Sequence, residues 1–175
     1  MRSKTCKSCK QPFAPARPLQ SVCSPLCAIK QVQLTKIKTV RKEVREAKLK
    51  LKTRSDWLKE AQAVFNKFIR LRDAGLNCIS CNTPMHKKVN AGHYKSVGAH
   101  PELRFNEFNV HAQCEHCNSF LSGNIVNYRR NLIKKIGIEG VEFVEGNHPA
   151  LKLNIEEIKQ LIAKYKTINK ALETE

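Results

Sequence analysis

The sequence CISC at residues 78–81, AGHY at 91–94 and NVHAQCEHCN at 109–118 carries the strongest structural signal in this chain. Thiolates at positions i and i+3 reach one tetrahedral zinc ion when a tight turn separates them, and two such pairs complete a closed four-sulfur site. We therefore predict a structural zinc bound by Cys78, Cys81, Cys114 and Cys117. The interval between the pairs is longer than in a simple zinc ribbon and leaves room for two strands and a loop.

The charge of the chain indicates a polyanionic partner. Its 175 residues include 32 Lys and Arg against 15 Asp and Glu, a formal net charge of +17. Such an excess favours nucleic acid, because neutralising phosphates releases condensed counterions. A basic membrane-surface protein is the main competitor, but the basic segment lacks the aromatic anchors of an interfacial helix. No run is long and apolar enough to span a membrane, so we expect no membrane partner.

All eight cysteines fall into four close pairs, which favours metal binding over disulfides. Cys6, Cys9, Cys23 and Cys27 are predicted to bind a second structural zinc, serving either as a DNA-positioning knuckle or as a folding staple. A secreted disulfide framework rarely places every cysteine so tightly, and the N-terminus does not resemble a signal peptide. We therefore expect a cytoplasmic protein.

Four segments are expected along the chain. They are an N-terminal zinc-binding module (1–28), a basic helix or linker (29–54), a zinc-stabilised domain (55–150) and a C-terminal amphipathic helix (151–175). Ser55, Asn124 and Asn154 are candidate helix N-caps, the last with Glu157 three residues on, and Gly137 is expected to end a helix.

The basic helix is the expected phosphate-binding surface. Residues 29–54 contain ten Lys or Arg against two Glu. A narrow apolar seam with 3-4-3-4 spacing runs along it: Ile37, Val40, Val44, Ala47 and Leu51. This seam suggests either docking onto the zinc-stabilised domain or pairing with another subunit, and a twofold homodimer is a hypothesis from geometry.

The stretch from Cys78 to Asn118 resembles the HNH, or ββα-metal, nuclease family in its variant with four zinc-binding cysteines. In that family a His ends one strand, an Asn opens the return strand, and a second cysteine pair leads into a helix. His93, Asn109 and Cys114–Cys117–Asn118 match that order. The resemblance implies a mainly α protein with a small zinc-stabilised ββα-metal (HNH-type) core and an N-terminal zinc-knuckle module. A zinc ribbon without chemistry is the alternative.

Nearly the whole chain is similar to the lambdoid phage NinG family, also called Rap for its role in recombination. The similarity rests on several short stretches: residues 56–59, 68–70, 78–81, 91–94, 103–106 and 122–124, with Cys23-Ser24-Pro25 and Cys27 before them. It implies a structure-specific DNA endonuclease acting on Holliday junctions and D-loops. Phage or host recombination proteins would then be expected as partners.

The resemblance implies a role for each residue of the site. His93 would activate water, since the pKa of a neutral imidazole lies near working pH. Asn118 matches the ligand of a catalytic magnesium or manganese ion, and its side-chain oxygen is a suitable hard ligand. Asn109 is expected to brace the loop between the strands while still being needed for activity. Arg104 is a candidate for contact with the scissile phosphate, or an ordinary surface arginine.

One position departs from the family pattern. Many HNH nucleases have Asp before the first His as the second metal ligand, and here that residue is Gly92. Asn90 and His111 are the candidate replacements, and the identity of the second ligand is left open between them. His86, His100 and His148 have no partner pattern and are expected on the surface, and His116, between the paired cysteines, is expected to be exposed on the knuckle. Three activities remain open: a branch-specific endonuclease, an HNH nickase without branch preference, and a non-catalytic zinc DNA-binding accessory protein.

Overall fold

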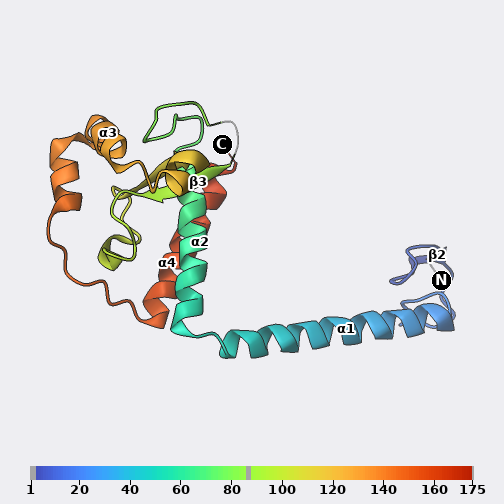
Figure 1. Ribbon diagram of the computed structural model, residues 1–175. Helices are drawn as coiled ribbons and strands as arrows, with labels where there is room; N and C mark the ends of the chain where they lie inside the picture. The colour runs from blue at the N-terminus through green and yellow to red at the C-terminus, as the bar shows by residue number, and fades with distance from the viewer. Residues whose placement is uncertain (1–2, 86–87, 175) are drawn as a thin grey trace. The chain divides into compact units, whose positions relative to one another are not determined.

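The computed structural model describes residues 3–85 and 88–174 (Figure 1). The chain forms two compact units, Met1–Lys52 and Thr53–Glu175. Most of the described residues are helical, as the sequence predicts. No helix in the described part of the chain is long and apolar enough to cross a membrane.

The N-terminal unit combines a small strand pair with one long helix. Strands β1 (Lys4–Thr5) and β2 (Pro12–Phe13) are antiparallel, with Lys4 opposite Phe13. Helix α1 (Pro25–Lys50) contains no buried residue. It begins four residues before the predicted start at residue 29, because the Ser24 side chain accepts a hydrogen bond from the N–H of Cys27 and Pro25 suits the first helical position.

Helices α2 (Arg54–Arg72) and α4 (Ile155–Leu172) form the main core of the second unit and lie side by side (Figure 1). The N-cap of α2 is Thr53, which forms a capping box with Asp56, so the expectation of Ser55 is wrong by two residues. The predicted capping box of Asn154 with Glu157 is confirmed at the start of α4.

A two-stranded antiparallel sheet carries the residues singled out by the sequence. Strand β3 (Val89–His93) pairs with β4 (Val110–Cys114), with Gly92 opposite His111 and His93 opposite Val110. Opposed residues share a face, as do residues two apart along one strand. Ala91, His93 and Val110 therefore lie on the same face, and Ala91 and Val110 pack against the α2–α4 core. A short 3₁₀ turn, η1 (Pro101–Leu103), lies in the connection between the strands.

The other face of the hairpin meets helix α3 (Ile125–Glu145), which follows a short π-helix, η2 (His116–Phe120). The Tyr128 hydroxyl donates to the Gly92 carbonyl at 2.9 Å. Gly137 is predicted to end this helix. It lies in the left-handed region at φ 77° and kinks α3, which then continues to Glu145. Asn124 occupies the N-cap position as predicted but makes no capping hydrogen bond, because its backbone is left-handed at φ 47° and its Oδ1 accepts from the Asn127 side chain.

Phe65 tests the core between α2 and α4. It is fully buried and packs edge-to-face against Tyr165 at 5.0 Å between ring centroids. Phe65→Ala is expected to lower the free energy of unfolding by about 3–5 kcal/mol in a denaturant titration, since a large cavity replaces the ring. The exposed Phe120 is the matched control, and Phe120→Ala should change it by less than about 0.5 kcal/mol. Equal effects of the two substitutions would contradict the assignment of the core.

Candidate functional site

The four cysteines of the second unit converge as a metal site requires. The sulfur atoms of Cys78, Cys81, Cys114 and Cys117 all lie within 4.8 Å of one another. Tetrahedral coordination with Zn–S bonds of about 2.3 Å places sulfurs about 3.8 Å apart. The Cys81 and Cys114 sulfurs are 3.8 Å apart, and none of the eight cysteines forms a disulfide. These residues therefore fit a zinc ion.

Local turns and backbone hydrogen bonds hold the sulfurs in place. Asn82 adopts a left-handed φ of 56°, and its N–H donates to the Cys78 carbonyl at 2.9 Å, closing the first turn. The N–H groups of Cys114 and Cys117 donate to the sulfurs of Cys78 and Cys114, each at 3.4 Å. Such bonds favour thiolates over thiols. The N–H of Ile79 donates to the Ala112 carbonyl, which attaches this turn to β4.

The second predicted cluster also forms, within the N-terminal unit. The sulfurs of Cys6, Cys9, Cys23 and Cys27 lie within 4.8 Å of one another. Cys27 lies in the first turn of α1, so the start of the basic helix itself contributes a metal ligand. The protein thus has two four-cysteine clusters that could each hold a zinc ion.

His93 ends β3 with one ring nitrogen engaged and the other available. Its Nε2 lies 3.2 Å from the Arg104 carbonyl oxygen, which can only accept, so Nε2 carries the proton. No hydrogen bond joins Nδ1 to any other residue that the structure describes. Burial lowers the pKa of His93, and the nearby Arg104 charge lowers it further, against the effect of the hydrogen bond. The ring is therefore a neutral base with a free Nδ1 at neutral pH.

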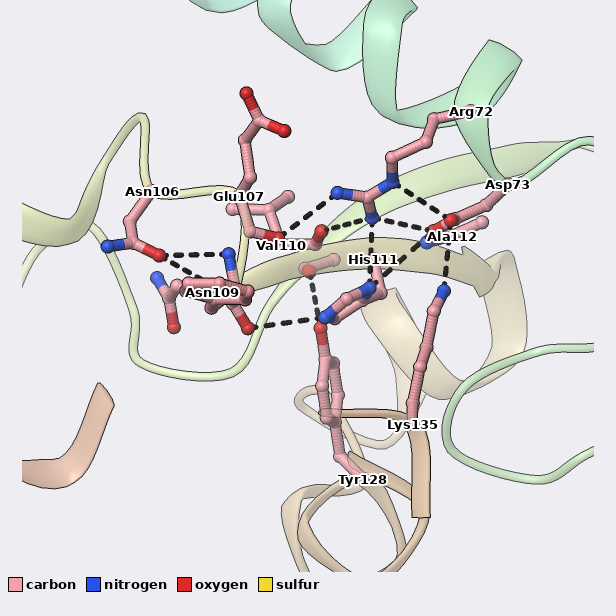
Figure 2. Close-up of polar contacts among 12 residues, drawn as sticks. Arg72, Asp73, Asn106, Glu107, Asn109, Val110, His111, Ala112, Tyr128 and Lys135 are labelled. Atoms are coloured by element: carbon pink, nitrogen blue, oxygen red, sulfur yellow. Dashed lines mark hydrogen bonds and ion pairs between the residues drawn. The ribbon is translucent and has the colours of Figure 1, made fainter. Parts of the chain in front are cut away.

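Asn109 braces the loop that follows β3. It is completely buried, and its Nδ2 donates to the carbonyls of Lys95 and Leu103 at 3.0 and 3.2 Å. Its Oδ1 accepts from the Lys95 N–H at 2.7 Å, and the backbone N–H of Asn109 reaches the Asn106 side chain (Figure 2). These contacts match the bracing expected from the sequence and tie together both ends of the connection that contains Arg104.

Gly92 leaves room for a side chain from the neighbouring strand. A Cβ at this position would collide with the carboxamide of Gln113, approaching its Cδ to 2.9 Å. The Gln113 Nε2 donates to the Ser80 hydroxyl at 2.6 Å and to the Gly123 carbonyl at 2.5 Å. A side chain at position 92 would therefore require the buried Gln113 side chain to move, a constraint that the sequence alone did not reveal.

His111 does not face the same site as His93. It is buried, with Nε2 donating to the Phe108 carbonyl at 3.2 Å and Nδ1 2.9 Å from an Arg72 nitrogen (Figure 2). Burial lowers its pKa, so the ring is neutral and Nδ1 accepts from Arg72. Because both nitrogens are engaged, His111 is not available as the metal ligand proposed from the sequence.

The other predicted residues differ in exposure and contacts. Asn90 is partly buried opposite Gln113, on the Gly92 face. Asn118 is partly exposed in η2, and its side chain forms no hydrogen bond within the described residues. His116 is exposed as expected, His100 and His148 are half-buried, and His86 lies outside the described residues.

A buried carboxylate beside the hairpin was not anticipated from the sequence. Asp73 follows α2, is 3% exposed and accepts hydrogen bonds from Arg72, Lys135 and the N–H of Ala112, each at about 2.9–3.0 Å (Figure 2). Burial raises its pKa, but the hydrogen bonds outweigh burial and hold the pKa of the carboxyl well below its usual range. Two of its partners, Ala112 and Lys135, lie 39 and 62 residues away in the sequence, so no local pattern could have identified the network.

Comparison with known proteins gives one consistent result. Residues 1–175 match the family described as Bacteriophage Lambda NinG protein. The chain is 41% identical to Protein ninG of Escherichia phage lambda over 93% of its own length and 89% of that protein. It is 39% identical to Protein ninG of Salmonella phage P22, covering 93% and 90%. No solved structure matches the chain.

Metal analysis tests the two clusters separately. The purified chain is expected to carry two zinc ions by elemental mass spectrometry. Cys117→Ser and Cys9→Ser should each lose one, but only Cys117→Ser should lower the unfolding temperature of the Thr53–Glu175 unit, since Cys9 lies in the other unit. Full zinc content in Cys117→Ser would contradict the assignment of the second cluster.

Asp73→Asn tests the buried carboxylate. The substitution leaves Arg72 and Lys135, whose side chains are 24% and 31% exposed, without their counter-charge, so we expect a loss of about 1–3 kcal/mol in the free energy of unfolding. The matched control is Glu156→Gln, which removes an exposed partner of Lys159 and should cost less than about 1 kcal/mol. A comparable small loss in both variants would show that the buried network adds little stability.

Proposed function

The chain belongs to the NinG family, and on that basis we propose that it is a structure-specific DNA endonuclease that cleaves branched recombination intermediates such as Holliday junctions and D-loops. The observation that carries the proposal is the placement of His93. His93 ends strand β3 and has a free Nδ1. The partner strand β4 begins directly after Asn109, and the chain then passes through the four-cysteine cluster to Asn118. This order of hairpin, cysteine cluster and helix supports an HNH-type ββα-metal core.

His93 is the proposed general base. Hydrolysis of a phosphodiester needs a water molecule deprotonated as it attacks phosphorus in line with the leaving oxygen. The Arg104 carbonyl fixes the ring orientation and tautomer, so Nδ1 accepts the proton. Asn109 acts indirectly, because its hydrogen bonds to Lys95 and Leu103 hold the loop from which that carbonyl comes.

Arg104 is proposed to contact the scissile phosphate. Its positive charge is near enough to lower the pKa of His93, and its side chain is partly exposed. A guanidinium presents two parallel N–H donors to a phosphate, which would orient the phosphorus toward water held by His93.

A divalent ion, Mg²⁺ or Mn²⁺, would supply charge neutralisation at the leaving oxygen when bound. Asn118 is its proposed ligand, with an amide oxygen that no described residue engages. Within residues 3–85 and 88–174 the only groups of three or more His, Cys, Asp or Glu side chains placed to hold a metal are the two cysteine clusters. No such group of acidic or histidine side chains therefore accompanies Asn118, and a DNA phosphate would complete the coordination of the ion.

The basic helix is the proposed main DNA-binding surface. None of the α1 residues is buried, so its cations are free to meet phosphates, and affinity should fall steeply with salt. A homodimer, contacts with phage or host recombination proteins, and action in the host bacterial cytoplasm are parts of the same proposal.

A non-catalytic DNA-binding accessory protein is the second candidate. Gly92 favours it, because the acid that many HNH nucleases place before the first His is absent. A nickase without branch preference is distinguished from the first candidate only by its substrates.

Cleavage by His93→Ala separates the candidates. Wild-type protein with Mg²⁺ should cut a labelled four-way junction faster than linear duplex or single strand, and not cut in EDTA. His93→Ala should bind the junction normally but cut it at least about 100-fold more slowly under single turnover. His148→Ala, a histidine outside the hairpin, should cut as wild type does. Equal cutting by wild type and His93→Ala would refute the assigned base, and no cutting by either would favour the accessory protein.

The pH profile of the same assay gives a second check. Because burial lowers the pKa of His93, the neutral base should persist through neutral pH, and the single-turnover rate should fall only below about pH 6.5 as the ring becomes protonated. A rate that rises as the pH falls below about 6.5 would contradict general-base catalysis by this histidine.

A further inference from the structure

A hollow of about 220 Å³ lies beside the loop that carries Arg104. Its walls come from the start of α2, the connection between the hairpin strands and the segment before α4, all within the Thr53–Glu175 unit. Two of its lining residues are arginines, Arg54 and Arg104, and none of them is acidic. The remaining lining residues are apolar, among them Leu58, Phe105, Leu151 and Leu153. The hollow therefore combines positive charge with an apolar surface.

The two guanidinium groups keep hydrogen-bond donors available for a ligand. Arg54 is exposed, and its Nε donates to the Leu153 carbonyl at 2.8 Å, which orients the side chain. Its two terminal nitrogens form no hydrogen bond within the described part of the chain, and neither does the Arg104 side chain. The parallel N–H donors of a guanidinium match the oxygens of a phosphate. This side of the hollow therefore suits a phosphate group.

The apolar lining suits a single nucleobase. Leu58, Phe105 and Leu153 all pack against the core between α2 and α4, so their positions are fixed before a ligand binds. Leu151 is 39% exposed, and the hollow is therefore open to solvent. Bases taken out of a duplex pack against aromatic and apolar side chains. Pockets for drug-sized ligands measure roughly 300–1,000 Å³, so this smaller space suits one base rather than a base pair.

The hollow adjoins the proposed general base. Nε2 of His93 donates to the Arg104 carbonyl at 3.2 Å, so Arg104 belongs to both places. His93 shares a hairpin face with Val110, and Phe105 packs against the same core as Val110 does. Extruding a base from a duplex costs a few kcal/mol, and the cost is least where the base is already unpaired. A nucleotide at a branch point therefore enters the hollow more easily than one within continuous duplex.

We propose that this hollow binds one unpaired nucleotide of DNA. The base packs against Phe105 and Leu151, and Arg54 and Arg104 bind the phosphate. The proposal rests on the proposed function, because it takes DNA as the ligand and identifies what the protein reads at a branch. Preference for branched DNA then comes from this hollow, whereas the basic helix meets phosphates whether or not the bases are paired.

Equilibrium binding in a buffer without divalent ions tests the proposal without relying on cleavage. Three fluorescent DNAs are compared by anisotropy: a duplex, the same duplex with one bulged thymidine, and that bulge with an abasic spacer in place of the thymidine. Zinc-loaded wild-type protein should bind the thymidine bulge about tenfold more tightly than the abasic bulge, because only the thymidine has a base to enter the hollow. Equal affinity for the two bulged DNAs would overturn the proposal.

Leu151→Ser tests the apolar wall. The variant should bind the thymidine and abasic bulges with affinities that differ by about twofold or less, because the base loses a packing surface. Leu76→Ser is the matched control, since Leu76 is also an exposed leucine in an irregular segment but does not line the hollow. It should keep the wild-type preference. A Leu151→Ser protein that holds its zinc and keeps the full preference would overturn the proposal.

Arg54→Ala tests the phosphate contact and serves as a second variant if Leu151→Ser does not fold. It should weaken binding to the thymidine bulge about tenfold and reduce the slope of log affinity against log salt by about one. Lys59→Ala removes the same charge from an exposed side chain of α2 outside the hollow, and should weaken binding far less. Equal losses in the two variants would also overturn the proposal.

The outcome can be separated from that of the proposed activity. If the preference for an unpaired base depends on Leu151 and Arg54 but wild-type protein cuts no DNA with Mg²⁺, the endonuclease proposal fails and the nucleotide site stands. If wild type cuts the four-way junction but binding does not depend on these residues, the nucleotide site fails and the endonuclease proposal stands.

Discussion

The convergence of four sulfur atoms is the constraint on which the candidate site depends. Cys81 and Cys114 are 33 residues apart in sequence but their sulfurs are 3.8 Å apart. A two-stranded sheet is marginal by itself in water. A zinc ion held by these cysteines would lock the start and end of the hairpin together, and the α2–α4 core and α3 would then cover its two faces. His93, Asn109 and Asn118 owe their relative placement to this arrangement.

Polar contacts of β4 fix its position relative to α2 and to the turns beside the cysteine cluster. Asp73 accepts the Ala112 N–H and two cationic side chains, which anchors β4 to the end of α2. Gln113 reaches across Gly92 to bind Ser80 and Gly123, which ties β4 to the turns on either side of the metal cluster. The glycine before His93 and the glutamine on the next strand thus form one structural unit, since a Cβ at position 92 would collide with the Gln113 carboxamide.

Features encoded locally were predictable from the sequence. The cysteine pairs follow from ligand spacing, the α4 cap from Asn154 and Glu157, and the interruption of α3 from Gly137. Thr53 was missed as the α2 cap because Ser55 offers an equally suitable hydroxyl two residues later. Three features could not be predicted: the contacts of His111, the hydrogen bonds of Asp73 and the contact of Gln113 with Gly92. Each depends on at least one partner that lies 35 or more residues away or on the adjacent strand, and only the folded chain brings these residues together.

Amide hydrogen exchange with and without zinc tests the central claim most directly. In the zinc-loaded protein the amides of Ile79 and Tyr94, which donate to Ala112 and Asn109, should be strongly protected. Removing zinc with a chelator should abolish that protection while amides within α2 and α4 stay protected, because those helices share a core of their own. Undiminished protection of Ile79 and Tyr94 in the zinc-free protein would contradict the claim that the metal cluster holds the hairpin in place.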